Sequence, residues 1–220
     1  MFVWAFTGNL GEGKTSAMSI LAHYYKNRAE RLLGHDIQLY SNYGLRDSYP
    51  LHSYKDFYHV AASPGSIVLL DEAQTSLDSR LFQKGSNIYM TQFIFYFRKL
   101  RCSLFMTTPH FKNLDSRIRM LCNILVDCHR TPAGFHYQIF DAQAQKLLRR
   151  RFLPMRIAKE IFKAKLYDTN NIVRAVKFPA NEREFDKFLT EIIRVNDQSS
   201  RGKKPIELDV LELEADLEAI

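Results

Sequence analysis

The chain has 220 residues, of which 46% are hydrophobic and 25% charged, as in an ordinary soluble globular protein with one sizeable core. No apolar run approaches the roughly 18 to 20 residues that span a bilayer, and the opening MFVWAF lacks the basic start of a signal peptide, so we expect a cytoplasmic protein without a transmembrane segment. The net charge is +7, and setting aside the six acidic side chains of residues 206–220 leaves +13 on residues 1–205. This excess favours a polyanionic partner, first of all nucleic acid; the alternative is that it serves solubility alone.

Short apolar segments alternate along the chain with longer segments of helical periodicity. The stretch Thr15–Leu33, for example, places Met18 and Leu21 near one face and Lys26 and Glu30 on the other. In chain order, the predicted strands are Phe2–Phe6, Asp36–Ser41, Ser66–Leu70, Ser103–Thr107 and Asn123–Asp127, and the predicted helices are Thr15–Leu33, Asn87–Leu100 and Glu184–Val195. This alternation predicts an α/β fold with a mostly parallel sheet covered on both faces.

The C-terminal third has a different pattern. Phe135–Phe140 and Leu147–Leu153 predict an antiparallel hairpin at one edge of the sheet, and the chain beyond Pro154 becomes helical. Asp197–Pro205 (DQSSRGKKP) has the composition of a linker. We therefore predict a core at 1–153, a small helical C-terminal appendage at 154–196, and a linker with an acidic tail at 197–220. Helical spacing in that tail predicts a helix that docks on its own domain, on a neighbouring subunit or over a basic surface.

The three cysteines, Cys102, Cys122 and Cys128, are too few and too scattered for a disulfide framework. Cys122 with Cys128–His129 is an alternative as a partial zinc site. All three lie in apolar, strand-like segments, where buried free thiols are common, so we predict core residues.

The strongest motif is the glycine-rich segment GNLGEGKT, which fits GxxxxGK[ST] and lies between a predicted strand and a predicted helix. Its glycines let successive backbone N–H groups approach phosphates, and the following helix adds the positive end of its dipole. Lys14 should reach the β- and γ-phosphates, and the Thr15 hydroxyl should ligate magnesium. The alternative is a glycine turn that binds nothing. The predicted nucleotide-binding residues are Gly8, Asn9, Leu10, Gly11, Glu12, Gly13, Lys14, Thr15 and Ser16.

Two adjacent carboxylates, Asp71 and Glu72, follow the apolar run Ile67–Leu70. Such a run predicts a buried strand, and ligands bind at the C-terminal ends of parallel strands. Asp71 would hold magnesium, and Glu72 would orient or deprotonate the attacking water. A small-molecule kinase, the alternative enzyme class, transfers phosphate to a bound hydroxyl and seldom needs a glutamate that activates water. The pair therefore indicates an ATPase with ATP and Mg²⁺ as cofactors.

The segment RKLRCSLFMTTPHFKNLD, residues 98–115, predicts a buried strand that ends at Thr107 and Thr108. Thr108 is a candidate catalytic residue beside the two carboxylates; the alternative is that both hydroxyls only cap the strand. Arginines cluster around this segment, and their planar, permanently charged side chains suit stabilisation of a transferring phosphoryl group, often from a neighbouring subunit. Arg98 and Arg119 are the candidate arginine fingers; the alternative for each is a solvated or DNA-facing charge.

The order of these motifs resembles the zonular-occludens-toxin-like branch of the FtsK–HerA superfamily over roughly residues 1–150. The glycine loop and the Asp71–Glu72 pair are shared with many P-loop proteins, and Tyr40–Asn42 ends the second strand as in this branch. The segments that narrow the family are Arg98–Lys99, Ser103–Thr108 and Asp115–Arg119, in this order.

The resemblance implies an additional-strand, RecA-like ATPase that assembles into a ring, a hexamer or pentamer, and drives double-stranded DNA. Viral genome packaging, with a capsid or portal protein as partner and a virion-associated location, is one such role. Family members usually carry a glutamine just after the threonine of the fourth strand. This chain has Pro109 and then His110, so Thr108 or His110 is the candidate substitute for that sensor. Many toxin-like members also carry a membrane-spanning segment, and we expect none here.

Three functions compete on these observations. The leading one is an ATP-driven DNA translocase, most concretely a viral genome-packaging ATPase. The alternatives are a small-molecule kinase and an ATP-driven morphogenesis or assembly factor that acts on protein. The basic excess and Asp71–Glu72 count against the kinase, whereas the sequence separates the translocase from the assembly factor poorly.

Overall fold

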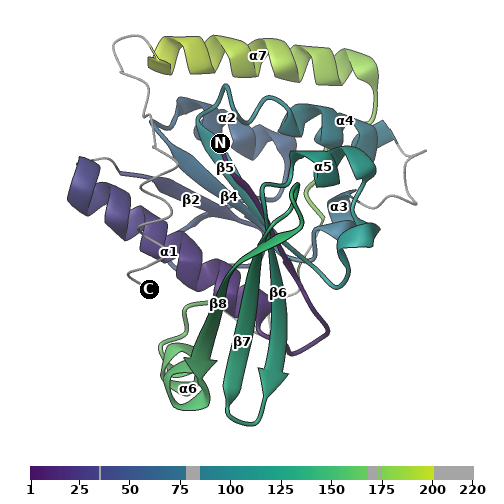
Figure 1. The fold of residues 1–220 in the computed structure, drawn as a ribbon. Coiled ribbons are helices and arrows are strands. Elements are labelled where there is room, and N and C mark those ends of the chain that lie inside the picture. The colour runs from purple at the N-terminus through teal and green to yellow at the C-terminus, as the bar shows by residue number, and fades with distance from the viewer. Residues whose placement is uncertain (35, 78–84, 168–172, 174, 201–220) are drawn as a thin grey trace.

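The computed structural model describes residues 1–34, 36–77, 85–167, 173 and 175–200. Within this part of the chain the strands form one eight-stranded sheet in the order β3-β2-β4-β5-β1-β6-β7-β8 (Figure 1). The strands are β1 (Val3–Thr7), β2 (Gln38–Ser41), β3 (Tyr49–Pro50), β4 (Ser66–Leu70), β5 (Cys102–Thr108), β6 (Ile124–Thr131), β7 (Gly134–Asp141) and β8 (Lys146–Pro154). Neighbours from β3 to β6 are parallel, and β6-β7-β8 are antiparallel. The predicted mostly parallel sheet with an antiparallel edge hairpin is confirmed.

The position of β5 identifies the fold class. This strand lies between β4, which ends just before Asp71, and β1, which leads into the glycine loop. It is the additional strand that the resemblance implied. The parallel register aligns Thr7 with Thr108 and Leu70 with Met106, so the C-terminal ends of β1, β4 and β5 lie side by side. The segments that follow these strands are therefore close in space although they are far apart in the sequence.

Helices cover both faces of the sheet because its central strands are apolar on both sides. In β4, Val68 and Leu70 belong to one hydrophobic cluster, whereas Ile67 and Leu69 belong to the other. The first cluster lies under α2 (Phe57–Ala62), α3 (Gln74–Leu77), α4 (Gly85–Ile94), α5 (Ser116–Leu121) and α7 (Glu182–Ser200). The second lies under α1 (Lys14–Leu33) and α6 (Met155–Lys163). Short 3₁₀ turns lie at Tyr54–Asp56 and Phe111–Asn113. In Figure 1 the strands β6, β7 and β8 extend past the body of the sheet, with α6 beside their far end.

The predicted helix Asn87–Leu100 is too long. The helix ends at Ile94, and residues 95–101 form successive turns in which Tyr96 N–H donates to Phe93 O at 2.8 Å and Leu100 N–H to Phe97 O at 3.1 Å. Arg101 then adopts a left-handed conformation, with φ of 53°, before β5 begins. The apolar periodicity continued through the turns because their large residues, such as Phe97, are also buried.

The predicted linker Asp197–Pro205 is wrong for its first four residues, because α7 extends to Ser200. Tertiary hydrogen bonds hold this last turn despite its polar composition. Arg101 Nη2 donates to Asn196 Oδ1 at 3.2 Å and to Ser199 Oγ at 3.3 Å, and Ser199 Oγ donates to Ala61 O at 3.0 Å.

The C-terminal helix α7 shares the core of the sheet. Phe188 and Ile192 are buried, and the ring of Phe188 lies 4.8 Å from that of Phe93 on α4. The division into regions 1–153, 154–196 and 197–220 stays a prediction, and the acidic tail 206–220 lies outside the described residues. Among the described helices, none combines the length and the apolar character needed to cross a membrane.

Candidate nucleotide-binding site

The glycine loop connects β1 to α1, as the motif requires, and two of its glycines are indispensable to its shape. Gly8 has a φ of 140°, and a Cβ there would lie 2.4 Å from the carbonyl oxygen of Cys128. Gly13 has a φ of 83°, and a Cβ there would lie 2.6 Å from Cδ1 of Phe135. Both positions therefore exclude a side chain, by backbone conformation and by space. The loop packs directly against β6 and β7.

The first turn of α1 presents the lysine and the hydroxyl that a nucleotide requires. Lys14 is buried, and its Nζ donates to Asn9 O at 2.8 Å across the loop. The helix begins at Lys14, and its N-cap Gly13 contributes no capping side chain. The N–H groups of this turn are thus the donors that a phosphate accepts, with the helix dipole in their favour. Leu10, by contrast, is 96% exposed, and the Ser16 hydroxyl lies 2.8 Å from the hydroxyl of Tyr167.

The Asp71 carboxylate lies against the start of α1. Its Oδ1 accepts hydrogen bonds from Thr15 Oγ1 at 3.0 Å and from Thr107 Oγ1 at 2.5 Å. Burial raises the pKa of Asp71, and the two hydroxyl donors oppose that shift. The structure thus brings together Thr15 and Asp71, the two predicted magnesium ligands, from positions 56 residues apart.

These residues fit a magnesium ion. A hydroxyl and a carboxylate are hard oxygen donors, and Mg²⁺ in nucleotide sites takes one or two protein ligands beside phosphate and water. A buried carboxylate whose charge is disfavoured by desolvation also gains from a nearby cation. When bound, the ion would neutralise phosphate charge; Thr15 and Asp71 would hold it.

Asn42 fixes the backbone of Asp71. Its Oδ1 accepts from Asp71 N–H at 2.8 Å, and its Nδ2 donates to Asp71 O at 3.1 Å. Both groups are buried. Sequence reasoning did not give Asn42 this role. The available signal was its position directly after β2, at the same sheet edge as Asp71 after β4.

Glu72 has a strained backbone. Its φ is 51°, a left-handed conformation that costs a non-glycine residue on the order of 1–3 kcal/mol. Thr107 stabilises it: the hydroxyl accepts from Glu72 N–H at 3.0 Å, and Thr107 O accepts from Ala73 N–H at 2.8 Å. The side-chain amide of Gln74 donates to the Glu72 carboxylate. The charge of Glu72 adds to the causes that raise the pKa of Asp71, so the two carboxylates lie close enough to interact.

Comparisons with known proteins agree with this geometry. Residues 45–171, more than half of the chain, match the family model described as Zonular occludens toxin (Zot). The chain belongs to the Zot family. No curated protein matches it.

A solved domain of zonular occludens toxin has the same fold. The N-terminal domain of zonular occludens toxin from Neisseria meningitidis aligns with a TM-score of 0.55 and 19% identity, covering 72% of this chain and 97% of that one. The genome packaging NTPase B204 from Sulfolobus turreted icosahedral virus 2, in complex with ATP-gammaS, gives 0.49 and 11%, covering 70% and 98%. This Zot-family chain shares the α/β fold of the zonular occludens toxin domain, with a mostly parallel sheet and a glycine loop after β1.

Thr107, and not Thr108, contacts the Asp71 carboxylate in the Zot-family chain. Alternate residues of a strand point to opposite faces, so Thr108 points away and its hydroxyl donates to His110 O at 3.2 Å. The predicted catalytic role of Thr108 therefore has no contact with the carboxylates to support it, whereas the Thr107 hydroxyl contacts both Asp71 Oδ1 and the backbone N–H of Glu72. Pro109 O accepts from Gly8 N–H at 3.3 Å, which ties the end of β5 to the glycine loop.

Among the arginines around β5, Arg98 lies away from the glycine loop and Arg117 is paired with Asp115. Arg98 is exposed and precedes β5. It therefore lies at the N-terminal ends of the parallel strands, whereas the glycine loop follows the C-terminal end of β1. Arg117 forms a bidentate contact with Asp115, with Nη2 to Oδ2 at 3.0 Å, and its hydrogen bonds are the main cause that lowers the pKa of Asp115. Arg119 lies half-buried on α5.

Proposed function

We propose that this chain is an ATP-hydrolysing motor that translocates double-stranded DNA, most concretely a viral genome-packaging ATPase. The single observation that carries the hydrolytic part is the pair Asp71–Glu72 at the end of β4. Asp71 is held by Thr15, Thr107 and Asn42, whereas Glu72 follows in a strained backbone conformation that Thr107 stabilises. Strain of this kind is concentrated at functional sites.

The residues divide the chemistry among them. Lys14 and the N–H groups of the first turn of α1 bind and orient the phosphates. Thr15 and Asp71 would hold a magnesium ion, which would neutralise phosphate charge. Glu72 orients the attacking water and accepts its proton, which a kinase that transfers phosphate to a bound hydroxyl does not need. The backbone contacts from Thr107 keep Glu72 at a fixed position relative to Asp71.

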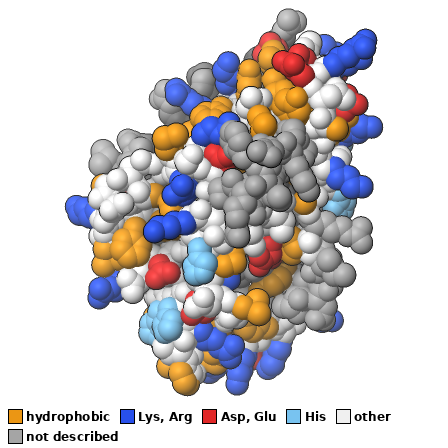
Figure 2. Space-filling view, turned by 90° about the vertical axis from the view of Figure 1, so that its right-hand side faces the viewer, with side chains coloured by type: hydrophobic (Ala, Val, Ile, Leu, Met, Phe, Trp, Pro, Cys, Tyr) orange, Lys and Arg blue, Asp and Glu red, His pale blue; other side chains and the backbone are white. Residues whose placement is uncertain are grey.

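Charge supports DNA as the substrate of the motor. Residues 1–205 carry a net +13, and binding to the phosphate backbone needs such an excess but no base recognition. Figure 2 shows Lys and Arg side chains spread over the face it draws, and not gathered in one patch. This distribution fits a protein that contacts a DNA duplex at several points better than one that binds it with a single flat surface.

A ring of copies, a hexamer or pentamer, completes the proposal, with a capsid or portal protein as its partner. The exposed Arg98 precedes β5, at the end of the strands opposite the glycine loop, and this position favours a role at the site of a neighbouring copy over one at its own site. A phosphoryl-stabilising arginine supplied in trans would make hydrolysis depend on assembly.

ATP hydrolysis measured with and without double-stranded DNA tests the proposal, with Lys14→Ala as the inactive control. We expect DNA to stimulate hydrolysis several-fold and the stimulation to fall steeply as salt rises. Hydrolysis that ignores DNA but responds to a capsid-type protein would instead indicate an assembly factor. Phosphate transfer to a small molecule in place of water would indicate a kinase.

A further inference from the structure

A polar face of the hairpin strands adjoins the glycine loop. In β6 and β7, Asp127 is opposite Gln138 and His129 is opposite His136, so these four residues share one face of the sheet. They line a cavity of about 570 Å³ together with residues of the glycine loop and of the loop after β5. Figure 2 shows histidine and acidic side chains close together on the face that it draws. The nucleotide chemistry described above uses none of these four residues.

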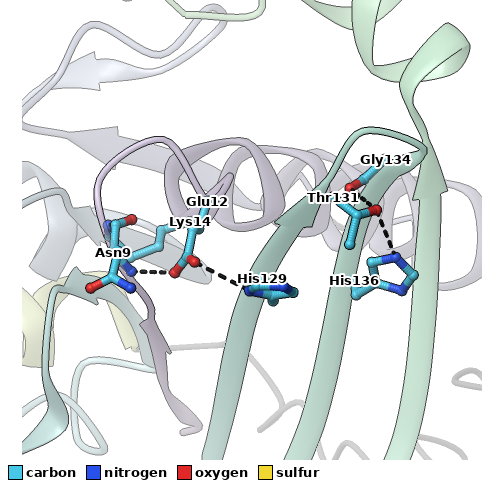
Figure 3. A network of polar contacts seen from close by, with 7 residues as sticks. All are labelled: Asn9, Glu12, Lys14, His129, Thr131, Gly134 and His136. Carbon is cyan, nitrogen blue, oxygen red and sulfur yellow. Dashed lines mark hydrogen bonds and ion pairs between the residues drawn. The ribbon is translucent and has the colours of Figure 1, made fainter.

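Glu12 connects the glycine loop to this face. One carboxylate oxygen accepts from Asn9 N–H, and the other lies 3.3 Å from Nδ1 of His129 (Figure 3). The Glu12 side chain is 16% exposed and that of His129 is 64% exposed. Because Lys14 Nζ donates to Asn9 O, the lysine and the glutamate hold the same residue from two sides. Glu12 is thus a negative charge built into a loop that binds negatively charged phosphates.

A bound triphosphate raises the electrostatic cost of this carboxylate, because like charges repel strongly in a partly buried site. A protonated His129 offsets that cost. The other charged and titratable groups around the pair are Lys14 on α1, Asp127, Cys128 and Arg130 on β6, His136 on β7 and His110 after β5. Burial raises the pKa of Asp127, the charge of Glu12 raises it further and His129 lowers it, so the three groups influence one another.

His136 provides a matched comparison on the same face. Thr131 Oγ1 donates to Gly134 O at 3.3 Å and lies 3.1 Å from Nε2 of His136. The tautomer of His136 decides whether the Thr131 hydroxyl donates to Nε2 or accepts from it. The His136 ring also packs against that of Phe152, with 4.6 Å between ring centroids and 34° between the ring planes. These contacts hold His136 within the hairpin, whereas His129 faces Glu12 (Figure 3).

We propose that His129 is a positioning residue of the nucleotide site: its protonated imidazole holds the Glu12 carboxylate on Asn9 N–H, beside β6, and compensates the charge that this carboxylate would present to a bound nucleoside triphosphate. The inference rests on the proposed function only in requiring that the loop binds such a nucleotide. DNA and translocation do not enter it.

A double-mutant cycle on the full chain tests the inference, with ATPγS and Mg²⁺ as the probe and affinity measured by calorimetry at pH 6 and pH 8. We expect His129→Gln to weaken binding about threefold at pH 6, in the range of partly exposed ion pairs, and much less at pH 8, where an imidazole is neutral. In a Glu12→Gln background, the same substitution should have no effect, because the carboxylate is gone. His136→Gln should leave the affinity unchanged at both pH values.

Three results would overturn the inference: an unchanged affinity of His129→Gln at pH 6, an equal loss in the Glu12→Gln background, or an equal loss for His136→Gln. The last two would indicate that the imidazoles only support the hairpin. A wild-type chain that binds no nucleotide would remove this inference and the proposed function together. A chain that shows the expected cycle but no stimulation by DNA would keep the inference and exclude the translocase.

Discussion

Individual residues around Asp71 divide into those that bind the nucleotide and those that act on water. Lys14 contacts phosphates in the ground state, whereas Glu72 acts when water attacks. We therefore expect Lys14→Ala to abolish ATP binding, and Glu72→Gln to keep near-normal binding while slowing hydrolysis by at least about 10²-fold, the lower range for a general base. Parallel measurements of ATPγS affinity and phosphate release check this pair. Near-normal turnover of Glu72→Gln would refute the role of Glu72.

The burial of the three cysteines also leads to a prediction at the scale of single residues. All are buried, as predicted for core residues, and burial raises the pKa of Cys102, Cys122 and Cys128 to about 12. The thiolate is the reactive form, and at pH 8 it is a small fraction of such a thiol. We expect no alkylation by iodoacetamide at pH 8 in the folded chain, and three modified thiols in denaturant. Mass spectrometry counts them, and rapid labelling of the folded protein would contradict the buried positions.

At the scale of elements, the sequence predicts those features that depend on residues close together in the chain. The glycine loop and the Asp71–Glu72 pair were visible because each motif is continuous and directly follows an apolar strand. The contacts of Asn42 and Thr107 with Asp71 were not, because they depend on the register between β2, β4 and β5. The Glu12–His129 contact spans 117 residues and needs the parallel pairing of β1 with β6. Local spacing carries no information on such pairings.

The edge strand β8 carries three consecutive arginines, Arg149–Arg151, which are candidates for DNA contacts. Strand alternation places Arg149 and Arg151 on one face, opposite Ile139 and Tyr137, and Arg150 on the other, opposite Gln138. The three arginines therefore lie on two opposite faces of the hairpin and do not form one patch. If DNA follows one face, Arg150→Ala and the double change Arg149→Ala/Arg151→Ala should differ in their effect.

We expect one of these two variants to reduce the salt dependence of DNA binding, by roughly one unit of the log–log slope for each phosphate that the protein no longer neutralises, and the other to leave it unchanged. Fluorescence anisotropy of a labelled duplex over a salt series measures the slope. Equal slopes for the wild type and both variants would mean that this strand is a solvated edge. Lys146→Ala, on the same strand and exposed, serves as the control for a general decrease in positive charge.

At the scale of the whole molecule, the two ends of the parallel strands carry different residues. The glycine loop, Asp71 and Glu72 lie at the C-terminal ends of the strands, and the exposed Arg98 lies at the N-terminal ends. Copies arranged head to tail would bring these two ends together, and repetition of such an interface forms a ring when the rotation between copies closes. Arg117 is less suited to act across that interface, because Asp115 holds its guanidinium in a bidentate pair.

Mixing two inactive variants tests the ring. Lys14→Ala chains cannot bind ATP but retain Arg98, and Arg98→Ala chains retain the nucleotide site. If the arginine acts in trans, a mixture should recover part of the hydrolysis because some sites pair an intact loop with an intact arginine. Phosphate release at a fixed total concentration measures the recovery, and Arg119→Ala and Arg117→Ala chains mixed in the same way identify which arginine is used. Absence of recovery for all three, together with hydrolysis by chains that sedimentation shows to be monomeric, would exclude a shared site.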